Sequence, residues 1–363
     1  MCASFWSNTG LSGRNSVCIL RVARARQFIA VTVSFFPLKD GHSLSIPPHN
    51  QELLQVYPIY ENAFFCEVCM TAEMEKSVLV YDVGGSHVAA AVCTAGSYQL
   101  GPIVSAPYPA EQTSEAFVAF LHSLGVKASA GFEGVSGAEL AFPGPFDFAA
   151  GISRMKHKLP FLYGVELRQA LAAPFGWQPA QVRFLHDSAA FLLGEIGAGA
   201  AHDFTRAVGI TLGTGIGAAF AVDSRVVTVG PGVPPDGEIW NLSYEDGIVE
   251  DYLSSRAIQG NYEERTGTLR EVVEIAGAAA DDAAAAAVFA EFGRHLGIAL
   301  RTVVAIFAPQ VVVLGGAISR SAHLFLPAAE SNLEGLNLRL VPSTLKDNAP
   351  LVGAAVEWFG GSR

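Results

Sequence analysis

The chain has 363 residues, half of them hydrophobic and 16% charged, which is enough apolar surface for a large core and excludes a disordered chain. Its 34 acidic and 23 basic residues give a net charge of -11, which disfavours non-specific binding to nucleic acid or anionic lipid. No apolar stretch reaches about 18 residues without interruption, so no membrane-spanning helix is predicted.

The first 73 residues differ in composition from the rest. Four arginines precede the first acidic residue, Asp40, and serine is frequent, which loosely matches a transit peptide. Met74 stands directly before a strong strand pattern. We therefore predict that residues 1–73 are an N-terminal extension outside the core, with a start-site artefact and a targeting peptide as the open alternatives.

Cysteine is concentrated in this extension. Of five cysteines, only Cys93 follows Met74, so the main body is not a disulfide scaffold and is expected to be cytoplasmic. Cys66 and Cys69 form a lone C-x-x-C without a second pair. Incidental thiols are the preferred interpretation, and metal binding is the alternative.

Two glycine-turn hairpins follow in the main body. Residues 77–82 and 88–93 are predicted strands around a turn at 83–86. The same pattern returns at 207–212 and 217–222, around a turn at 213–215. The repetition indicates two homologous halves.

The remaining elements alternate between helices and strands. Apolar spacing and length predict helices at 115–124, 188–196, 247–258, 282–308 and 349–359, and strands at 138–142, 182–185 and 311–314. Several of these strands end at a glycine or an acid. This order is typical of an α/β protein.

The hairpin turns are candidate phosphate loops, because glycines let backbone N–H groups approach phosphate oxygens. Asp82, at the end of its strand, is positioned to hold Mg²⁺ directly or through water. The second turn resembles a dinucleotide fingerprint, but a strand follows it instead of a helix, which disfavours a Rossmann site. The alternative for both turns is an ordinary hairpin.

Acidic residues supply the other candidates. Asp187 follows a strand and is either a helix N-cap or a general base. Glu238 and Glu250 are either acceptors for a polyhydroxylated ligand or plain surface carboxylates. Gly315 and Gly316 either admit a flat ring or serve packing.

The order of these motifs closely resembles the ROK family of sugar kinases and sugar-sensing repressors, which belongs to the hexokinase–actin–Hsp70 superfamily. The resemblance runs from Ser77 to about Phe359. It implies a two-domain actin-like ATPase (RNase H-like) fold with a cleft between the domains. The implied small domain is 76–186 plus 345–363, and the large domain is 187–344.

The resemblance also implies roles for individual residues. Asp187 is similar to the family's catalytic base, and ATP with Mg²⁺ would be the cofactors, with Asp82 near the metal. Nucleotide contacts would come from Asp82, Gly84, Gly85, Ser86, Gly213, Thr214, Gly215, Gly217, Gly315 and Gly316. Sugar contacts would come from Pro143, Gly144, Pro145, His186, Asp187, Glu238, Asn241 and Glu250.

The sequence departs from the family pattern at three places. His186 stands where the family usually has Asn, and Trp240-Asn241 where it usually has Gly-His. Residues 242–249 contain neither Cys nor His, so no zinc is expected there.

The sequence thus predicts an ATP-dependent kinase of a glucose-like hexose. The alternative is a catalytically weak, ROK-type sugar-binding regulator. The expected partners are a sugar and ATP, with a possible homodimer and without nucleic acid or membrane.

Overall fold

The structure, a computed structural model, describes residues 16–25, 28–37 and 76–360. The chain divides into two compact units, Met1–Ala72 and Glu73–Arg363. In the first unit the described residues are two antiparallel strands, β1 (Ser16–Ala25) and β2 (Phe28–Pro37). Cys66 and Cys69 lie outside the described residues.

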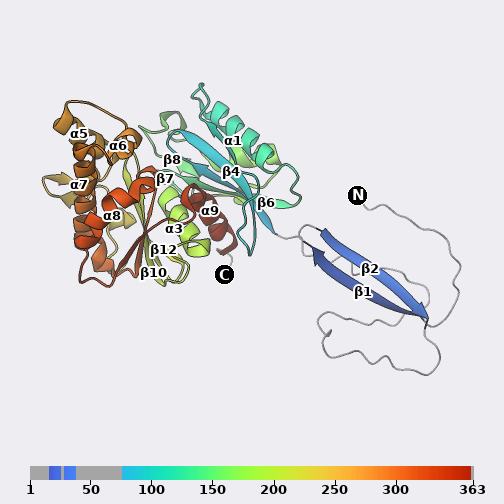
Figure 1. Ribbon diagram of the computed structural model, residues 1–363. Coiled ribbons are helices and arrows are strands. Elements are labelled where there is room, and N and C mark those ends of the chain that lie inside the picture. Colours follow the sequence, from blue (N-terminus) through green and yellow to red (C-terminus); the bar gives the residue numbers. More distant parts are fainter. Residues whose placement is uncertain (1–15, 26–27, 38–75, 361–363) are drawn as a thin grey trace. The chain divides into compact units, whose positions relative to one another are not determined.

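The second unit opens with a five-stranded sheet in the order β5-β4-β3-β6-β9. Figure 1 labels two of its strands, β4 and β6. The first hairpin is confirmed, because β3 and β4 pair in antiparallel fashion around the turn after Val83. Strands β6 and β9 extend the sheet in parallel. The bounds are β3 (Ser77–Val83), β4 (His87–Thr94), β5 (Val104–Pro107), β6 (Val135–Phe142) and β9 (Val182–His186).

A second five-stranded sheet repeats this arrangement. Its order is β12-β11-β10-β15-β16, again with three antiparallel strands followed by two parallel ones. The predicted second hairpin and the two homologous halves therefore hold as topology. The bounds are β10 (Arg206–Leu212), β11 (Ile216–Val222), β12 (Arg225–Val227), β15 (Val311–Gly315) and β16 (Arg339–Pro342).

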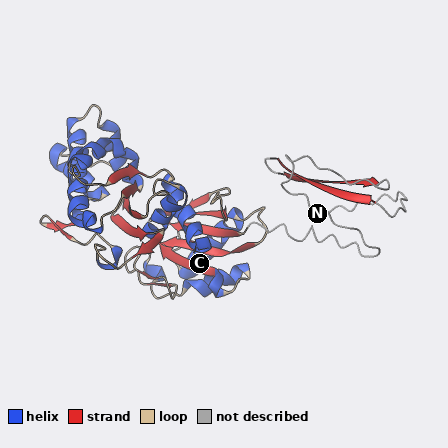
Figure 2. Ribbon diagram, turned by 90° about the horizontal axis from the view of Figure 1, so that it is seen from below, coloured by secondary structure: helices blue, strands red, loops and turns tan. Residues whose placement is uncertain are grey.

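Helices cover the outer face of each sheet (Figure 2). On the first sheet, α1 (Ser114–Ala128) and α2 (Leu167–Ala172) bury an apolar cluster that includes Phe117 and Leu121. On the second, α7 (Ala283–Ala299) and α8 (Ala322–Ser331) bury Phe289, Phe292 and Phe325. Shorter helices in the second half are α4 (Val249–Tyr252), α5 (Ser255–Thr266) and α6 (Val272–Ala278).

Two further helices, α3 (Asp187–Ala198) and α9 (Ala349–Gly360), lie side by side between the two sheets (Figure 1). Helix α9 packs on β3, β4 and β6, whereas α3 packs on β10 and β11. They approach closely because glycines face the neighbouring backbone: a Cβ on Gly353 would lie 1.7 Å from the carbonyl oxygen of Ala190. The helix pair thereby connects the two sheets.

Two helix predictions differ from the structure. The helix expected at 247–258 is wrong as one element: it is a short strand, β14 (Gly247–Ile248), then α4, then α5. The break occurs because Ser254 accepts a hydrogen bond from the N–H of Ala257 and so caps α5. The helix expected at 282–308 loses its α geometry after Ala299, where a π-helical turn, Leu300–Val304, and a 3₁₀ turn follow.

The segment Ala283–Phe307 is the one described helix that is long and apolar enough to cross a membrane. The structure buries 56% of its most apolar window. Phe289, Phe292 and Leu296 on this segment belong to the core under the second sheet. Its hydropathy is therefore that of a core helix.

Candidate active site

The site is assembled at the carboxyl ends of β6 and β9. These strands run in parallel with Phe142 opposite His186, so the residues that follow each strand meet at one edge of the sheet. Pro143-Gly144-Pro145 follows β6, and Asp187 follows β9. A Cβ on Gly144 would lie 3.1 Å from Nε2 of His186, so only glycine leaves this ring its present room.

Three polar side chains meet here. Nδ1 of His186 lies 3.2 Å from Oδ1 of Asp187, and its Nε2 lies 3.6 Å from Oε1 of Glu238. Glu238 comes from the other half of the unit, after a 3₁₀ turn at Pro235–Gly237. The Asp187 side chain is 42% exposed, so its carboxylate is open to a ligand. The structure therefore brings together three of the predicted sugar-site residues.

The structure also separates the two interpretations of Asp187. Helix α3 begins at Asp187, and the N-cap position belongs to His186, whose side chain makes no capping hydrogen bond. The carboxylate of Asp187 accepts from the N–H of Ser188 at 2.7 Å. Asp187 is thus the first helical residue, with one carboxylate oxygen free of this contact.

Electrostatics mark Asp82, at the end of β3. Burial, followed by the carboxylates of Asp187 and Asp347, raises the pKa of Asp82 to about 7. The pKa of Glu238 is also raised, chiefly by burial, while His186 and Lys158 lower it. Several carboxylates thus share one region, which favours a cation there.

The first glycine loop is open on its outer side. Gly85 and Ser86 are exposed, and a Cβ on Gly85 would meet no atom within 4 Å. The loop is held at its base, where Gly84 donates to the carbonyl of His87 at 3.1 Å and Tyr108 donates to the carbonyl of Gly84. This leaves the tip available for phosphate oxygens.

The second glycine loop is braced from below by Glu250. The carboxylate of Glu250 accepts from the N–H of Ile216 at 3.3 Å, and a Cβ on Gly215 would lie 2.2 Å from its Oε2. Both N–H and hydroxyl of Ser255 donate to the carbonyl of Gly213 at 2.8 Å. Glu250 therefore supports the loop on which Thr214 is exposed, and its expected role at the sugar stays a prediction.

Packing accounts for the third glycine motif. A Cβ on Gly315 would lie 2.3 Å from the ring of Phe191. Gly316 has a φ of +80°, and a Cβ there would lie 2.3 Å from the carbonyl oxygen of Leu212. An adenosine contact at these glycines stays a prediction.

Asn241 lies apart from the group around His186. It is exposed, and within residues 76–360 no hydrogen bond or ion pair joins its side chain to His186, Asp187 or Glu238. Its predicted sugar contact is untested by the structure.

The loop that lacks cysteine and histidine folds as a small hairpin of β13 (Ser243–Tyr244) and β14. Tyr244 is buried, its hydroxyl lies 2.9 Å from Nδ1 of His295, and its ring packs edge-on against Tyr252. Trp240, a large side chain that precedes this loop, is 41% exposed. The packing of Tyr244 thus anchors the hairpin.

The sequence patterns did not single out Ser188, in the site, or the buried Glu195, farther along α3. Ser188 joins the two halves of the site, since its hydroxyl donates to the carbonyl of Ala218 on β11 at 2.8 Å. Glu195 is fully buried and accepts from the N–H of Leu345 at 3.1 Å and from that of Ala200 at 2.7 Å. Asp347 lies two residues after Leu345, and its carboxylate helps to raise the pKa of Asp82. Ser188 and Glu195 both lie on α3, and apolar spacing along a helix does not signal hydrogen bonds to distant segments.

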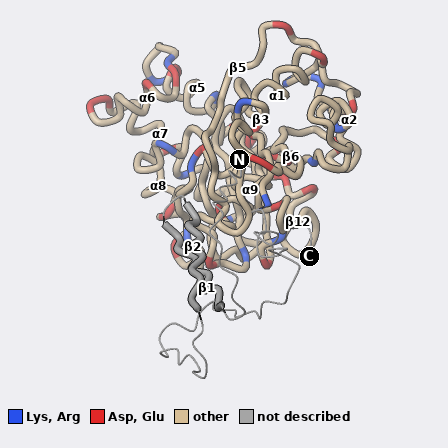
Figure 3. The backbone as a smooth tube through the Cα atoms, turned by 90° about the vertical axis from the view of Figure 1, so that its right-hand side faces the viewer, with Lys and Arg blue, Asp and Glu red and all other residues tan. Residues whose placement is uncertain are grey.

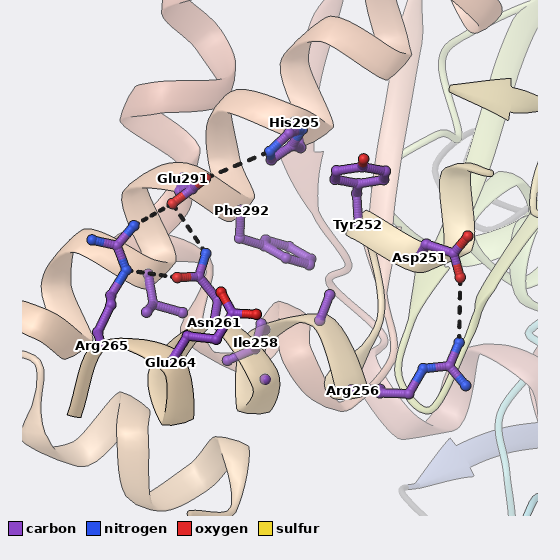
Figure 4. Close-up of a pocket in the computed structure, with 13 residues that line it drawn as sticks. Asp251, Tyr252, Arg256, Ile258, Asn261, Glu264, Arg265, Glu291, Phe292 and His295 are labelled. Carbon is purple, nitrogen blue, oxygen red and sulfur yellow. Dashed lines mark hydrogen bonds and ion pairs between the residues drawn. The ribbon is translucent and has the colours of Figure 1, made fainter. Parts of the chain in front are cut away.

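A separate pocket of about 610 Å³ lies between α5 and α7 (Figure 4). In this pocket, Arg265 donates to Asn261 and forms an ion pair with Glu291, so the polar groups that line the pocket largely bind one another. None of the predicted site residues lines it. The pocket is therefore separate from the candidate site at the strand ends.

Charge is distributed over both halves of the second unit, without a single basic stripe along the tube (Figure 3). A small β-hairpin, β7 (Phe146–Asp147) with β8 (Ile152–Ser153), leads to the basic segment Arg154–Lys158, whose Lys158 lowers the pKa of Glu238.

Comparison with known proteins assigns the family. A sequence model of the ROK family matches residues 78–359. The chain belongs to the ROK family. The resemblance noted in the sequence and the actin-like ATPase fold are both confirmed.

The ROK relatives include sugar kinases. A glucokinase from Thermotoga maritima is 30% identical over an alignment of 249 residues, and the match covers 59% of this chain and 76% of that protein. The crystal structure of a ROK hexokinase from Thermus thermophilus has a TM-score of 0.67 at 26% identity, and the match covers 79% of this chain and 99% of that one.

Two more distant structures share the fold. A ROK family glucokinase from Streptomyces griseus, in complex with glucose and AMPPNP, has a TM-score of 0.65 at 21% identity, with 77% of this chain and 98% of that one covered. A ROK family transcriptional regulator, a homologue of the E. coli MLC protein, has a TM-score of 0.66 at 22% identity, with 78% of each chain covered. The fold therefore occurs in both kinases and regulators.

Proposed function

We propose that this ROK protein is an ATP-dependent sugar kinase that transfers the γ-phosphate of ATP to a hydroxyl of a glucose-like hexose. The observation that carries the proposal is the half-exposed carboxylate of Asp187, beside His186 and Glu238, with Ser188 next to it bonded to Ala218 on β11, the strand that follows the second glycine loop. The proposed base, Asp187, thus lies beside the proposed sugar-binding residues His186 and Glu238 and near the second glycine loop, the proposed phosphate site.

In the proposed reaction, a sugar hydroxyl gives its proton to Asp187 while its oxygen attacks the γ-phosphorus of ATP. The bond from that phosphorus to the bridging oxygen breaks, and ADP leaves. Phosphoryl transfer needs mainly positioning and neutralisation of charge. Glu238 and His186 orient the sugar, and the N–H groups of Gly84–Ser86 and Gly213–Gly217 hold the phosphates.

A divalent cation fits the region around Asp82. The pKa of Asp82 is raised partly by Asp187 and Asp347, and such mutual repulsion is relieved when a cation binds. Mg²⁺ bound there would neutralise the phosphate charge that opposes attack. Within the described residues, no three His, Cys, Asp or Glu side chains converge as a complete metal site, so phosphate and water would supply further ligands.

The test is an ADP-release assay over hexoses and N-acetylhexosamines, with the Asp187→Asn variant as control. We expect turnover with at least one hexose, loss of turnover when EDTA removes Mg²⁺, and no effect of a zinc-specific chelator. ADP release that is equal with and without every sugar contradicts the proposal. One tightly bound zinc per chain contradicts the expected absence of zinc.

The second candidate is a catalytically weak sugar-binding regulator. Two observations favour it: His186 stands where the family usually has Asn, and the fold is shared with a ROK transcriptional regulator. Calorimetry separates the two functions, because a regulator binds a sugar with measurable affinity while ADP release stays at background. The cytoplasmic location and a homodimer remain predictions.

A further inference from the structure

A chain of hydrogen bonds determines which ring nitrogen of His186 carries the hydrogen when the imidazole is neutral. The hydroxyl of Ser188 donates to the carbonyl of Ala218 at 2.8 Å and lies 2.6 Å from Nδ1 of His186. A backbone carbonyl can only accept, so the single hydroxyl hydrogen of Ser188 is used in that bond. The oxygen of Ser188 must then accept from Nδ1, which carries the ring hydrogen.

A second neighbour requires the same tautomer. Oδ1 of Asp187 lies 3.2 Å from the same Nδ1, and an ionised carboxylate only accepts hydrogen bonds. Ser188 is only 2% exposed, so water does not take over its contacts. A neutral imidazole has one N–H, and Nε2 therefore keeps a free lone pair.

The lone pair of Nε2 faces Glu238. The distance of 3.6 Å to Oε1 of Glu238 is longer than a hydrogen bond, and both atoms are acceptors when the ring is neutral and Glu238 is ionised. The ring is held in place by Phe148, whose centroid lies 5.7 Å away at an interplanar angle of 74°. The absence of a side chain at Gly144 keeps Nε2 accessible.

We propose that His186 is a specificity-determining residue whose Nε2, together with the Glu238 carboxylate, selects sugars that present two adjacent hydroxyl groups as hydrogen-bond donors. An asparagine would offer both a donor and an acceptor at this position, whereas the neutral imidazole offers an acceptor alone. A sugar with a fluorine in place of one of these hydroxyls leaves an acceptor facing an acceptor. The inference rests on the proposed sugar-kinase function.

The kinetic test compares the best hexose with its 2-, 3- and 4-deoxyfluoro analogues, in the wild type and in the His186→Asn variant. At the position that faces Nε2, we expect fluorination to lower kcat/KM of the wild type by roughly 10–100-fold, since an acceptor that the bound sugar covers loses its donor. The ratio of kcat/KM for the hexose to kcat/KM for its fluoro analogue should be about tenfold smaller in His186→Asn, because the asparagine amide supplies an N–H donor. The exposed His323 on α8 serves as matched control, and His323→Asn should leave all the ratios unchanged.

A ratio that is the same in the wild type and in His186→Asn at every position overturns the proposal. So does a uniform loss for all the sugars in the variant, because that would indicate a purely structural role. If no sugar is phosphorylated, the proposed kinase function fails, and calorimetric affinities of the same sugars decide the specificity without turnover.

The tautomer has its own readout, independent of activity. In sugar-free protein labelled with ¹⁵N-histidine at about pH 8.5, where an ordinary imidazole is neutral, the signal lost in His186→Asn should have the Nδ1–H pattern. Ser188→Ala should shift that signal towards a mixture of tautomers. An Nε2–H pattern in the wild type overturns the proposal, whatever the kinase activity.

Discussion

Asp187 combines a structural position with a chemical one. It begins α3, accepts from the N–H of Ser188 at 2.7 Å and keeps 42% of its side chain exposed. Asp187→Asn preserves the shape and the acceptor oxygen but removes the proton acceptor. We expect kcat to fall by roughly 10²–10⁴-fold with little change in the melting temperature. A rate near that of the wild type, measured by ADP release, would leave Asp187 a structural role alone.

Asp82 is expected to make stability depend on pH. Its pKa is raised to about 7, against about 3.9 in an unfolded chain, so the folded state favours the protonated form. The folded protein therefore loses stability as pH rises from about 4 to about 7, and Asp82→Asn removes this loss. We expect Asp82→Asn to be stabilising by about 1–3 kcal/mol at pH 8 and by much less at pH 4.

Urea unfolding at both pH values measures the effect of Asp82→Asn. The exposed Asp203 provides a matched control, and Asp203→Asn should change stability little at either pH. An equal effect of Asp82→Asn at both pH values would show that the pKa of Asp82 is not raised in the folded protein.

Glu195 is a buried acceptor for the segment that precedes α9. Its carboxylate accepts from the N–H of Leu345 and from the hydroxyls of Ser343 and Thr344, and none of its side chain is exposed. Glu195→Gln turns one acceptor into a donor that faces other donors. We expect a loss of about 2–4 kcal/mol in urea unfolding. Glu330→Gln, on the exposed surface of α8, should cost far less, and similar losses for both variants would contradict this role.

Among the elements, α3 and α9 depend on the absence of side chains where they cross. A Cβ on Gly353 would lie 1.7 Å from the carbonyl oxygen of Ala190, and one on Gly194 would lie 2.0 Å from that of Ala349. Alanine normally stabilises a helix relative to glycine by roughly 0.5–1 kcal/mol. Overpacking costs about 1–3 kcal/mol or more, so Gly353→Ala should be destabilising.

A glycine in α5 supplies the control for Gly353→Ala. A Cβ on Gly260 would meet no atom within 4 Å, so Gly260→Ala should be stabilising by roughly 0.5–1 kcal/mol. The two variants should move the urea midpoint in opposite directions. A shift of the same sign in both would show that α3 and α9 separate readily.

At the scale of the whole molecule, residues 1–73 should be dispensable. The structure divides the chain after Ala72, and both five-stranded sheets lie within the second unit. A chain that begins at Met74 should be soluble, melt at the same temperature and show the same ADP release as the full chain. Aggregation, or melting several degrees lower, would show that the extension packs on the main body.

Local patterns were sufficient for much of this protein. The two glycine-turn hairpins, the strand ends at His186 and Gly315 and the start of α3 were all predicted within a few residues. Such features depend on turn chemistry and on apolar spacing, which short segments carry by themselves. The order of the motifs was also sufficient to indicate the family.

Contacts between distant segments required the tertiary structure. Glu250 braces Gly215, Ser188 fixes the tautomer of His186 through Ala218, and Gly315 makes room for Phe191. The single helix expected at 247–258 was wrong because the cap at Ser254 and the anchoring of α5 on Gly213 outweighed its apolar spacing. These contacts depend on which segments the sheets and the α3–α9 pair bring together, and spacing along the chain does not encode that proximity.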